Sequence, residues 1–298
     1  MTTQVSLSHV DRWRTLAGSL AGGALAAATG SAVACLGWAV FGLAWVDWVL
    51  VGVLVAVGTQ AVVAGARRRR WLRRVLLCFV TVSLLAGSAA TVLYALTPGV
   101  SDAAQRVEHQ AALRGTSDPV VRPPARVADA LLATEDSRFY VNGGMDLVGA
   151  GHAALASVRG GDSGGATLEQ QLAKLLYSDG RDGLLDRSED AMLAVKLDHR
   201  WSKEAILEMY LAAAYFGHGY YGLDAAASGY FGTSPERLDW PQAALLAGTV
   251  QAPSAYDPIR HPGLAARRRA HVLERLAATG VITPAQERRF TRAPLQLG

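Results

Sequence analysis

Apolar residues fill three long runs in the first third of the chain, at about residues 16–43, 46–66 and 75–96. A helix needs about 20 predominantly apolar residues to cross the hydrocarbon core of a bilayer, and each run is long enough. The first run is too long for the apolar region of a cleaved signal peptide, and two more runs follow it. The pattern therefore predicts three transmembrane helices within residues 1–97.

Basic residues predict how these helices are oriented. The short segment between the second and third runs, residues 67–74, carries six Arg, and such a loop normally stays in the cytoplasm. Arg12 and Arg14 place the N-terminus on the same side, whereas the connection between the first two runs has no basic residue. With three crossings, the chain after about residue 97 is expected on the extracytoplasmic side of the cell membrane. We interpret residues 1–97 as a membrane anchor.

The pattern changes to amphipathic, helical periodicity after the third run. Residues 98–124 are polar with weak helical character, and we interpret them as a linker. Over residues 125–298 apolar side chains recur at helical spacing, and no stretch alternates as a strand does. Ser202 is a predicted N-cap. The sequence thus predicts a mainly α domain over residues 125–298, with helices near 125–135, 170–176, 187–200, 203–216, 223–230, 241–249 and 264–279.

The formal net charge of +4 is not spread evenly along the chain. Residues up to 97 hold eight Arg and two Asp, and the remainder holds 21 Lys plus Arg against 23 Asp plus Glu. The outer domain is therefore slightly acidic, which argues against a nucleic-acid partner. Both cysteines, Cys35 and Cys78, fall in apolar runs, and the seven His lack zinc-site spacing. We expect no disulfide framework and no dedicated metal site in the outer domain.

Five segments in the outer domain carry the candidate chemistry. Residues 135–146 read Glu-Asp-Ser-Arg-Phe-Tyr-Val-Asn-Gly-Gly-Met-Asp, and residues 165–174 read Gly-Ala-Thr-Leu-Glu-Gln-Gln-Leu-Ala-Lys. Residues 186–190 read Asp-Arg-Ser-Glu-Asp and lead into Trp-Ser-Lys-Glu-Ala-Ile-Leu-Glu-Met-Tyr-Leu at 201–211. The remaining segments are Phe-Gly-His-Gly at 216–219 with Tyr-Phe-Gly at 230–232, and Leu-Leu-Ala-Gly at 245–248 with Tyr-Asp-Pro at 256–258.

In this order the segments resemble the peptidoglycan glycosyltransferase family, which includes the transglycosylase domain of bifunctional penicillin-binding proteins and monofunctional transglycosylases. The family motifs are Glu-Asp, two residues, Phe and usually His; Gly-Ser-Thr-Ile-Thr-Gln-Gln-Leu-x-Lys; Arg-Lys-x-x-Glu; and Ser-Lys-x-x-Ile-Leu-Glu-x-Tyr-Leu-Asn. Any single motif is weak evidence, whereas the ordered set is specific. The chain is identified as a divergent member, and the resemblance implies a lysozyme-like helical domain.

The resemblance also implies a reaction, in which a sugar hydroxyl of one membrane-bound lipid II substrate attacks the anomeric carbon of another and undecaprenyl pyrophosphate leaves. A carboxylate must accept the hydroxyl proton, and cations must offset the charge on the pyrophosphate. By motif position, the implied catalytic pair is Glu135, as the base, and Asp190. The implied substrate-binding residues are Asp136, Arg138, Thr167, Gln170, Gln171, Lys174 and Arg187. The family commonly uses a divalent cation, Mg²⁺ or Mn²⁺, near the pyrophosphate.

Several positions depart from the family motifs. Asp190 stands where the family has Glu and is shorter by one methylene, and Asp186 stands where it has Arg, four residues earlier on the same helical face. Arg181 and Arg187 are the candidates to compensate for the lost cation. Asn142 replaces His, and the other losses of polar or charged side chains are Ala166 for Ser, Ala212 for Asn and Gln242 for Glu. We expect these changes to affect the activity more than the fold.

Three functions stay open on the sequence. An active glycosyltransferase is favoured by Glu135, the adjacent pair Gln170 and Gln171, and Lys174. A catalytically impaired relative, which binds lipid II or cell-wall synthesis proteins, is favoured by the altered segment 186–190. Lytic cleavage of glycan needs only one acid, but the ordered polymerase motifs argue against it. Residues 147–158, which are partly apolar, are expected to form a membrane-facing lip, and no transpeptidase domain is expected.

Overall fold

The computed structural model describes residues 78, 81–82, 87–116, 122–146, 149, 166–178, 181 and 183–298. The chain divides into two compact units, Met1–Leu96 and Thr97–Gly298. The boundary falls at the Thr97-Pro98-Gly99 segment that ends the third apolar run. The two units are described separately below.

The first unit is described only at residues 78, 81–82 and 87–96, and the last of these segments is helical. The predicted transmembrane helices at 16–43 and 46–66 and the basic loop between the second and third helices lie outside the described residues, as does most of the third helix. Within the described part of the chain, no helix is both long enough and apolar enough to cross a membrane. Apart from Gly149, the predicted lip at 147–158 also lies outside the described residues.

The second unit is helical, which confirms the prediction of a mainly α domain. Its described residues form no strand, and the nearest feature to one is an isolated antiparallel bridge between Tyr215 and Tyr221. The bridge closes the turn between these two tyrosines. The elements are α4 (Ala103–Arg114), α5 (Ala125–Glu135), α7 (Leu168–Tyr177), α8 (Leu184–Arg200), α9 (Lys203–Ala213), α10 (Leu223–Phe231), the 3-10 helix η1 (Pro235–Arg237), α11 (Trp240–Thr249), α12 (Pro262–Ala278) and α13 (Pro284–Arg292).

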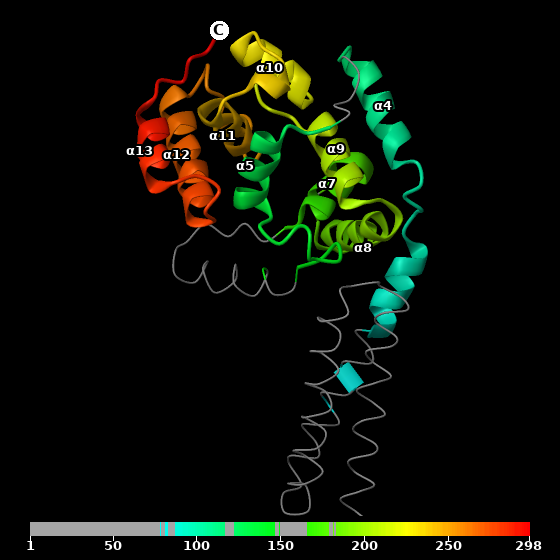
Figure 1. Ribbon diagram of the computed structural model, residues 1–298. Helices are drawn as coiled ribbons and strands as arrows, with labels where there is room; N and C mark the ends of the chain where they lie inside the picture. The colour runs from blue at the N-terminus through cyan, green and yellow to red at the C-terminus, as the bar shows by residue number, and fades with distance from the viewer. Residues whose placement is uncertain are drawn as a thin grey trace, which may run out of the picture. The chain divides into compact units, whose positions relative to one another are not determined.

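These helices pack in two groups that share one hydrophobic core (Figure 1). In one group α5 contacts α11 and α12, and α13 covers α12. In the other group α7 contacts α8 and α9, and α4 lies against α9. The end of α5 and the start of α7 meet where the two groups join, and this junction holds the residues of the first two motifs.

Side-chain caps fix where several of these helices begin. Ser202 accepts a hydrogen bond from Ala205 N, so the predicted N-cap of α9 is confirmed. Asp239 caps α11 in a capping box, in which the side chain of Gln242 accepts a hydrogen bond from Asp239 N. An N-cap of this kind contributes about 1 kcal/mol to stability. Gln242, a position where the family usually has Glu, therefore still serves the fold.

Helix α4 lies inside the segment that we interpreted as a linker. Its Ala103 and Val107 are buried in the core. Just before the helix, Lys196 Nζ donates to Thr97 O at 2.6 Å and Trp201 Nε1 donates to Val100 O at 2.9 Å. Residues 97–114 therefore belong to the packed domain. Two buried positions four residues apart are too few to give a clear amphipathic pattern in the sequence.

Candidate active site

Glu135 is the last residue of α5, and its side chain is only 9% exposed. Arg268 Nη2 lies 3.0 Å from Glu135 Oε1, and Gln171 Nε2 donates to Glu135 Oε2 at 3.4 Å. A guanidinium at this distance stabilises a carboxylate in its ionised form, which is the form that accepts a proton. The structure thus holds the predicted base between one residue of α12 and one of α7.

Arg268 is a site residue that the sequence did not reveal. Its side chain is 6% exposed, its Nε donates to Gly248 O at 3.4 Å, and its guanidinium lies 5.8 Å from the centre of the Tyr256 ring. Gly248 makes room for it, because a Cβ at position 248 would lie 2.9 Å from Arg268 Cγ. Close packing of α11 on α12 therefore directs Arg268 to Glu135.

Tyr210 orients the amide of Gln171. The Tyr210 hydroxyl donates to Gln171 Oε1 at 2.8 Å, which leaves the amide nitrogen to face Glu135. Burial raises the pKa of Tyr210, and the negative charge of Glu135 raises it further. The hydroxyl therefore stays protonated and keeps donating. Tyr210 lies in the motif at 201–211, but its contact with Gln171 could not be predicted from that motif.

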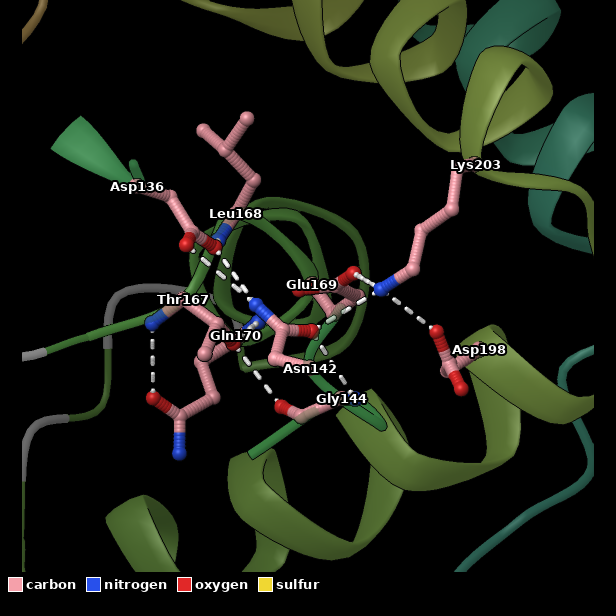
Figure 2. Close-up of polar contacts among 9 residues, drawn as sticks. All are labelled: Asp136, Asn142, Gly144, Thr167, Leu168, Glu169, Gln170, Asp198 and Lys203. Atoms are coloured by element: carbon pink, nitrogen blue, oxygen red, sulfur yellow. Dashed lines mark hydrogen bonds and ion pairs between the residues drawn. The ribbon is translucent and has the colours of Figure 1, made fainter. Parts of the chain in front are cut away.

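Asp136 joins the end of α5 to the start of α7 (Figure 2). Its carboxylate accepts from Leu168 N at 3.1 Å and from Asn142 Nδ2 at 3.0 and 3.2 Å. The side chain is buried, and burial raises the pKa of Asp136, while these hydrogen bonds and the charge of Lys203 oppose the rise. Asp136, which the resemblance implied as a substrate-binding residue, therefore holds the backbone beside Glu135.

Thr167 and Gln170 form the capping box of α7. Thr167 Oγ1 accepts from Gln170 N at 3.2 Å and donates to Gly144 O at 2.8 Å, while Gln170 Oε1 accepts from Thr167 N at 3.0 Å. Figure 2 shows both side chains turned to the backbone at the start of the helix. The two residues predicted to bind substrate are thus used, at least in part, to hold α7 against the first motif.

Arg138 and Phe139 secure the rest of the first motif. Arg138 Nε lies 3.1 Å from Asp146 Oδ2, and Asp146 also accepts from Gly149 N at 2.9 Å. Phe139 is 1% exposed and packs in the core. Arg138 therefore ties the two ends of the segment 135–146 together.

One face of α7 connects the two predicted acidic residues. Gln171, Lys174 and Ser178 are spaced by three and four residues, so they share a helical face. Gln171 contacts Glu135 at one end, and at the other end the Ser178 hydroxyl donates to the buried carboxylate of Asp190 in a short hydrogen bond. Lys174, between them, is exposed. The structure therefore places Glu135 and Asp190 at opposite ends of α7.

Asp186 has a cation beside it. Arg181 Nη1 lies 3.2 Å from Asp186 Oδ1, and Asp186 Oδ2 accepts from Gly183 N at the start of α8. Arg181 Nη2 also lies 4.0 Å from Glu189 Oε2. Arg187, the other candidate to compensate, is exposed. Asp186 therefore serves as a helix-start residue paired with Arg181.

The predicted residues thus fall into two clusters. Glu135, Asp136 and Gln171 meet at the junction of α5 and α7, and Asp190 lies at the far end of α7 beside Ser178. Within the described ranges, no group of three or more His, Cys, Asp or Glu residues is arranged to hold a metal ion.

A family model described as Transglycosylase matches residues 105–277, which is more than half of the chain. The chain therefore belongs to the transglycosylase family, and the membership predicted from the ordered motifs is confirmed. The match begins within α4 and ends within α12, so it includes every residue of the two clusters.

The relatives that the chain resembles are penicillin-binding proteins. Penicillin-binding protein 1A of Aquifex aeolicus is 40% identical over 174 residues, which cover 58% of this chain and 24% of that protein. Penicillin-binding protein 1F of Bacillus subtilis is 37% identical over 162 residues, which cover 54% of this chain and 23% of that protein. The chain thus spans about a quarter of their length. A crystal structure of penicillin-binding protein 1A from Haemophilus influenzae aligns with a TM-score of 0.38 and 23% identity, over 61% of this chain and 18% of that one.

Proposed function

We propose that the chain is a peptidoglycan glycosyltransferase that polymerises lipid II into glycan strands, with Glu135 as the general base. The observation that carries this proposal is the setting of Glu135, whose nearly buried carboxylate is held by Arg268 and Gln171. A carboxylate that must accept a proton needs to be ionised and aimed, and these two contacts do both.

The proposed reaction transfers one glycosyl group. Glu135 takes the proton of an acceptor hydroxyl as that oxygen bonds to the anomeric carbon of the donor. The bond from that carbon to the pyrophosphate oxygen breaks, and undecaprenyl pyrophosphate leaves with the bonding electrons. Lys174 and Arg187, both exposed, are the proposed cations for the pyrophosphate, and Asp190 is the proposed second acidic residue. Gln171 is proposed to contact substrate as well as Glu135.

Membrane anchoring is part of the same proposal. Residues 1–97 would place three transmembrane helices before the domain, with the domain on the extracytoplasmic side. Lipid II is itself held in the membrane by its polyprenyl tail, so an anchored enzyme and its substrate would encounter each other by diffusion within the membrane plane. A divalent cation, Mg²⁺ or Mn²⁺, is proposed only as an addition to Lys174 and Arg187 at the pyrophosphate.

One observation favours a second candidate, a catalytically impaired relative that binds lipid II or cell-wall synthesis proteins. Asp190 is a methylene shorter than the family's Glu, and its carboxylate already accepts a hydrogen bond from the Ser178 hydroxyl. A displacement of about 1 Å at a reacting group can cost roughly 100-fold in rate. The domain would then keep its binding surface and lose most of its turnover.

Purified full-length protein incubated with labelled lipid II separates the two candidates. We expect polymer from the wild type and none from Glu135→Gln. Glu274→Gln is the matched control, because Glu274 lies on the same helix as Arg268 but its side chain is 76% exposed. No polymer from the wild type, with retained lipid II binding, would favour the impaired relative. Equal polymer from wild type and Glu135→Gln would exclude Glu135 as the base.

A further inference from the structure

Lys203, the first residue of α9, places its ammonium among oxygen atoms from three segments (Figure 2). Nζ lies 2.6 Å from Glu169 Oε1 on α7, 2.7 Å from Asp198 Oδ1 on α8 and 2.8 Å from Asn142 Oδ1 in the first motif. The Lys203 side chain is 17% exposed and its ammonium lies 4.8 Å from the centre of the Phe139 ring. Three acceptors match the three N–H groups of an ammonium.

Glu169 depends on this ammonium. The residue is 0% exposed, and its Oε2 has no hydrogen-bond partner in the described part of the chain. A buried carboxylate is tolerated when a cation compensates its charge. Burial raises the pKa of Glu169, and Lys203 opposes the rise. The family motif has Thr at this position, so the buried charge is a departure of this chain, as Asn142 is.

Asn142 links Lys203 to Asp136, the residue next to the proposed base. Its Oδ1 accepts from Lys203 Nζ and from Gly144 N, and its Nδ2 donates to both carboxylate oxygens of Asp136. An amide can accept from a cation and donate to an anion at the same time, whereas an Asp at this place would face Asp136 with a like charge. Asp136 directly follows Glu135 in the sequence, so the two share a peptide bond.

We propose that Lys203 is a positioning residue for the general base, acting through Asn142 and Asp136 on the backbone of Glu135. This inference rests on the proposed function of Glu135. Asn142 and Glu169, which replace the His and Thr of the family motifs, are then not two independent changes, because both side chains contact the Lys203 ammonium. Lys203 has two roles in this arrangement: it neutralises Glu169, and it orients the Asn142 amide.

Two variants separate these roles. Lys203→Met leaves Glu169 and Asp198 without their cation, and we expect Tm to fall by on the order of 5–10 °C. Lys203→Met combined with Glu169→Gln removes one charge of each sign, and we expect it to regain most of that Tm. Since Asn142 Oδ1 still lacks the Lys203 ammonium and keeps only Gly144 N as a donor, kcat with lipid II should stay at least about tenfold below wild type while KM changes little.

The matched control is Lys196→Met, which changes the one Lys of this chain that lies outside the proposed site and its supporting contacts. It should leave turnover unchanged. A readout that does not depend on activity is amide hydrogen exchange at Gly144 and Leu168, whose N–H groups donate to Asn142 and Asp136. Exchange at both amides should be faster in the paired variant than in Lys196→Met.

The outcomes are distinct. Turnover that recovers together with Tm in the paired variant would show that Lys203 only neutralises Glu169, and would overturn the proposal. Unchanged exchange at Gly144 and Leu168 would also overturn it. If the wild type makes no polymer, the proposed function fails, but the exchange at these two amides still decides whether Lys203 holds the first motif in place.

Discussion

Arg268 Nη2 lies 3.0 Å from Glu135 Oε1, although 133 positions separate the two residues in the chain. The contact joins the C-terminal end of α5 to α12, and both side chains are nearly buried. The proposed base, Glu135, therefore depends on the last third of the domain as much as on its own motif.

Removing either charge of the pair should destabilise the protein more than removing both. Glu135→Gln and Arg268→Gln each leave one nearly buried charge without this partner, and we expect each to cost about 3–5 kcal/mol of unfolding free energy. The double variant should recover most of that stability and still make no polymer. Urea unfolding of the four proteins measures the coupling. Strictly additive losses would mean that the contact contributes little.

Gly248→Ala should reduce activity by displacing Arg268. A Cβ at position 248 would lie 2.9 Å from Arg268 Cγ, in the middle of the side chain, so the guanidinium must shift. We expect a loss of about 1–3 kcal/mol in stability. We also expect kcat to fall when it is measured well below Tm, where the variant is still folded. Gly263→Ala is the control on α12, because its Cβ would meet only Arg267 Nη1 at 4.0 Å. Equal kcat for both variants would contradict the spacer role of Gly248.

Lys174→Met should weaken use of the pyrophosphate substrate. Lys174 lies on the α7 face between Gln171 and Ser178, and a charged contact of this type is worth about 1.5–3 kcal/mol. We expect kcat/KM for lipid II to fall by about 10- to 100-fold. Steady-state polymerisation at several salt concentrations measures this, and Lys196→Met is the control. A fall of the same size in the control would point to general destabilisation.

Asp190→Glu should raise activity only when space is made for it. The Asp190 carboxylate is buried and already contacts Ser178, so an added methylene has little room. We expect Asp190→Glu alone to cost about 1–3 kcal/mol of stability. The pair Asp190→Glu with Ser178→Ala should polymerise lipid II faster than wild type or Ser178→Ala alone. A paired variant that is slower than both would show that Asp190 is not the counterpart of the family's Glu.

Glu169→Gln should gain stability relative to wild type as the pH rises. Burial raises the pKa of Glu169 above its usual value of 4.5, so the folded protein binds this proton more tightly than the unfolded chain does. The wild type therefore loses stability as the pH passes from 4.5 up through the raised pKa, and the Gln variant lacks this loss. Below pH 4.5 the two proteins should be similar. Thermal unfolding between pH 4 and 8 tests the sign.

The helical fold and the first motif could be predicted from the sequence, because both are local. Periodicity located seven helices, and Ser202 marked the start of α9 as the structure has it. Helix α13 was missed because Phe290 is its one large apolar residue, too little to mark a helical pattern in the sequence, although Thr283 and Gln286 form a capping box that the sequence displays.

The partners of the proposed base could not be predicted, because they depend on packing. Arg267, Arg268 and Arg269 are consecutive, and nothing in their sequence says which one turns to Glu135. Gly248 leaves the space that the Arg268 side chain occupies, and that is visible only when α11 and α12 are placed together. At Asp186 the sequence named Arg181 and Arg187 as the candidate cations, and the structure places Arg181 Nη1 3.2 Å from Asp186 Oδ1.

Helix α7 works as a fixed interval between the two ends of the proposed site. Gln171 and Ser178 are seven residues apart, which is close to two turns and about 10 Å along the axis. One residue inserted or deleted between them would rotate Ser178 by about 100° about the helix axis relative to Gln171, and so away from its partner Asp190 on α8. Side chains at either end of this interval can therefore be exchanged, as the family's Glu is exchanged for Asp190 in this chain. The number of residues between the two ends has to stay the same.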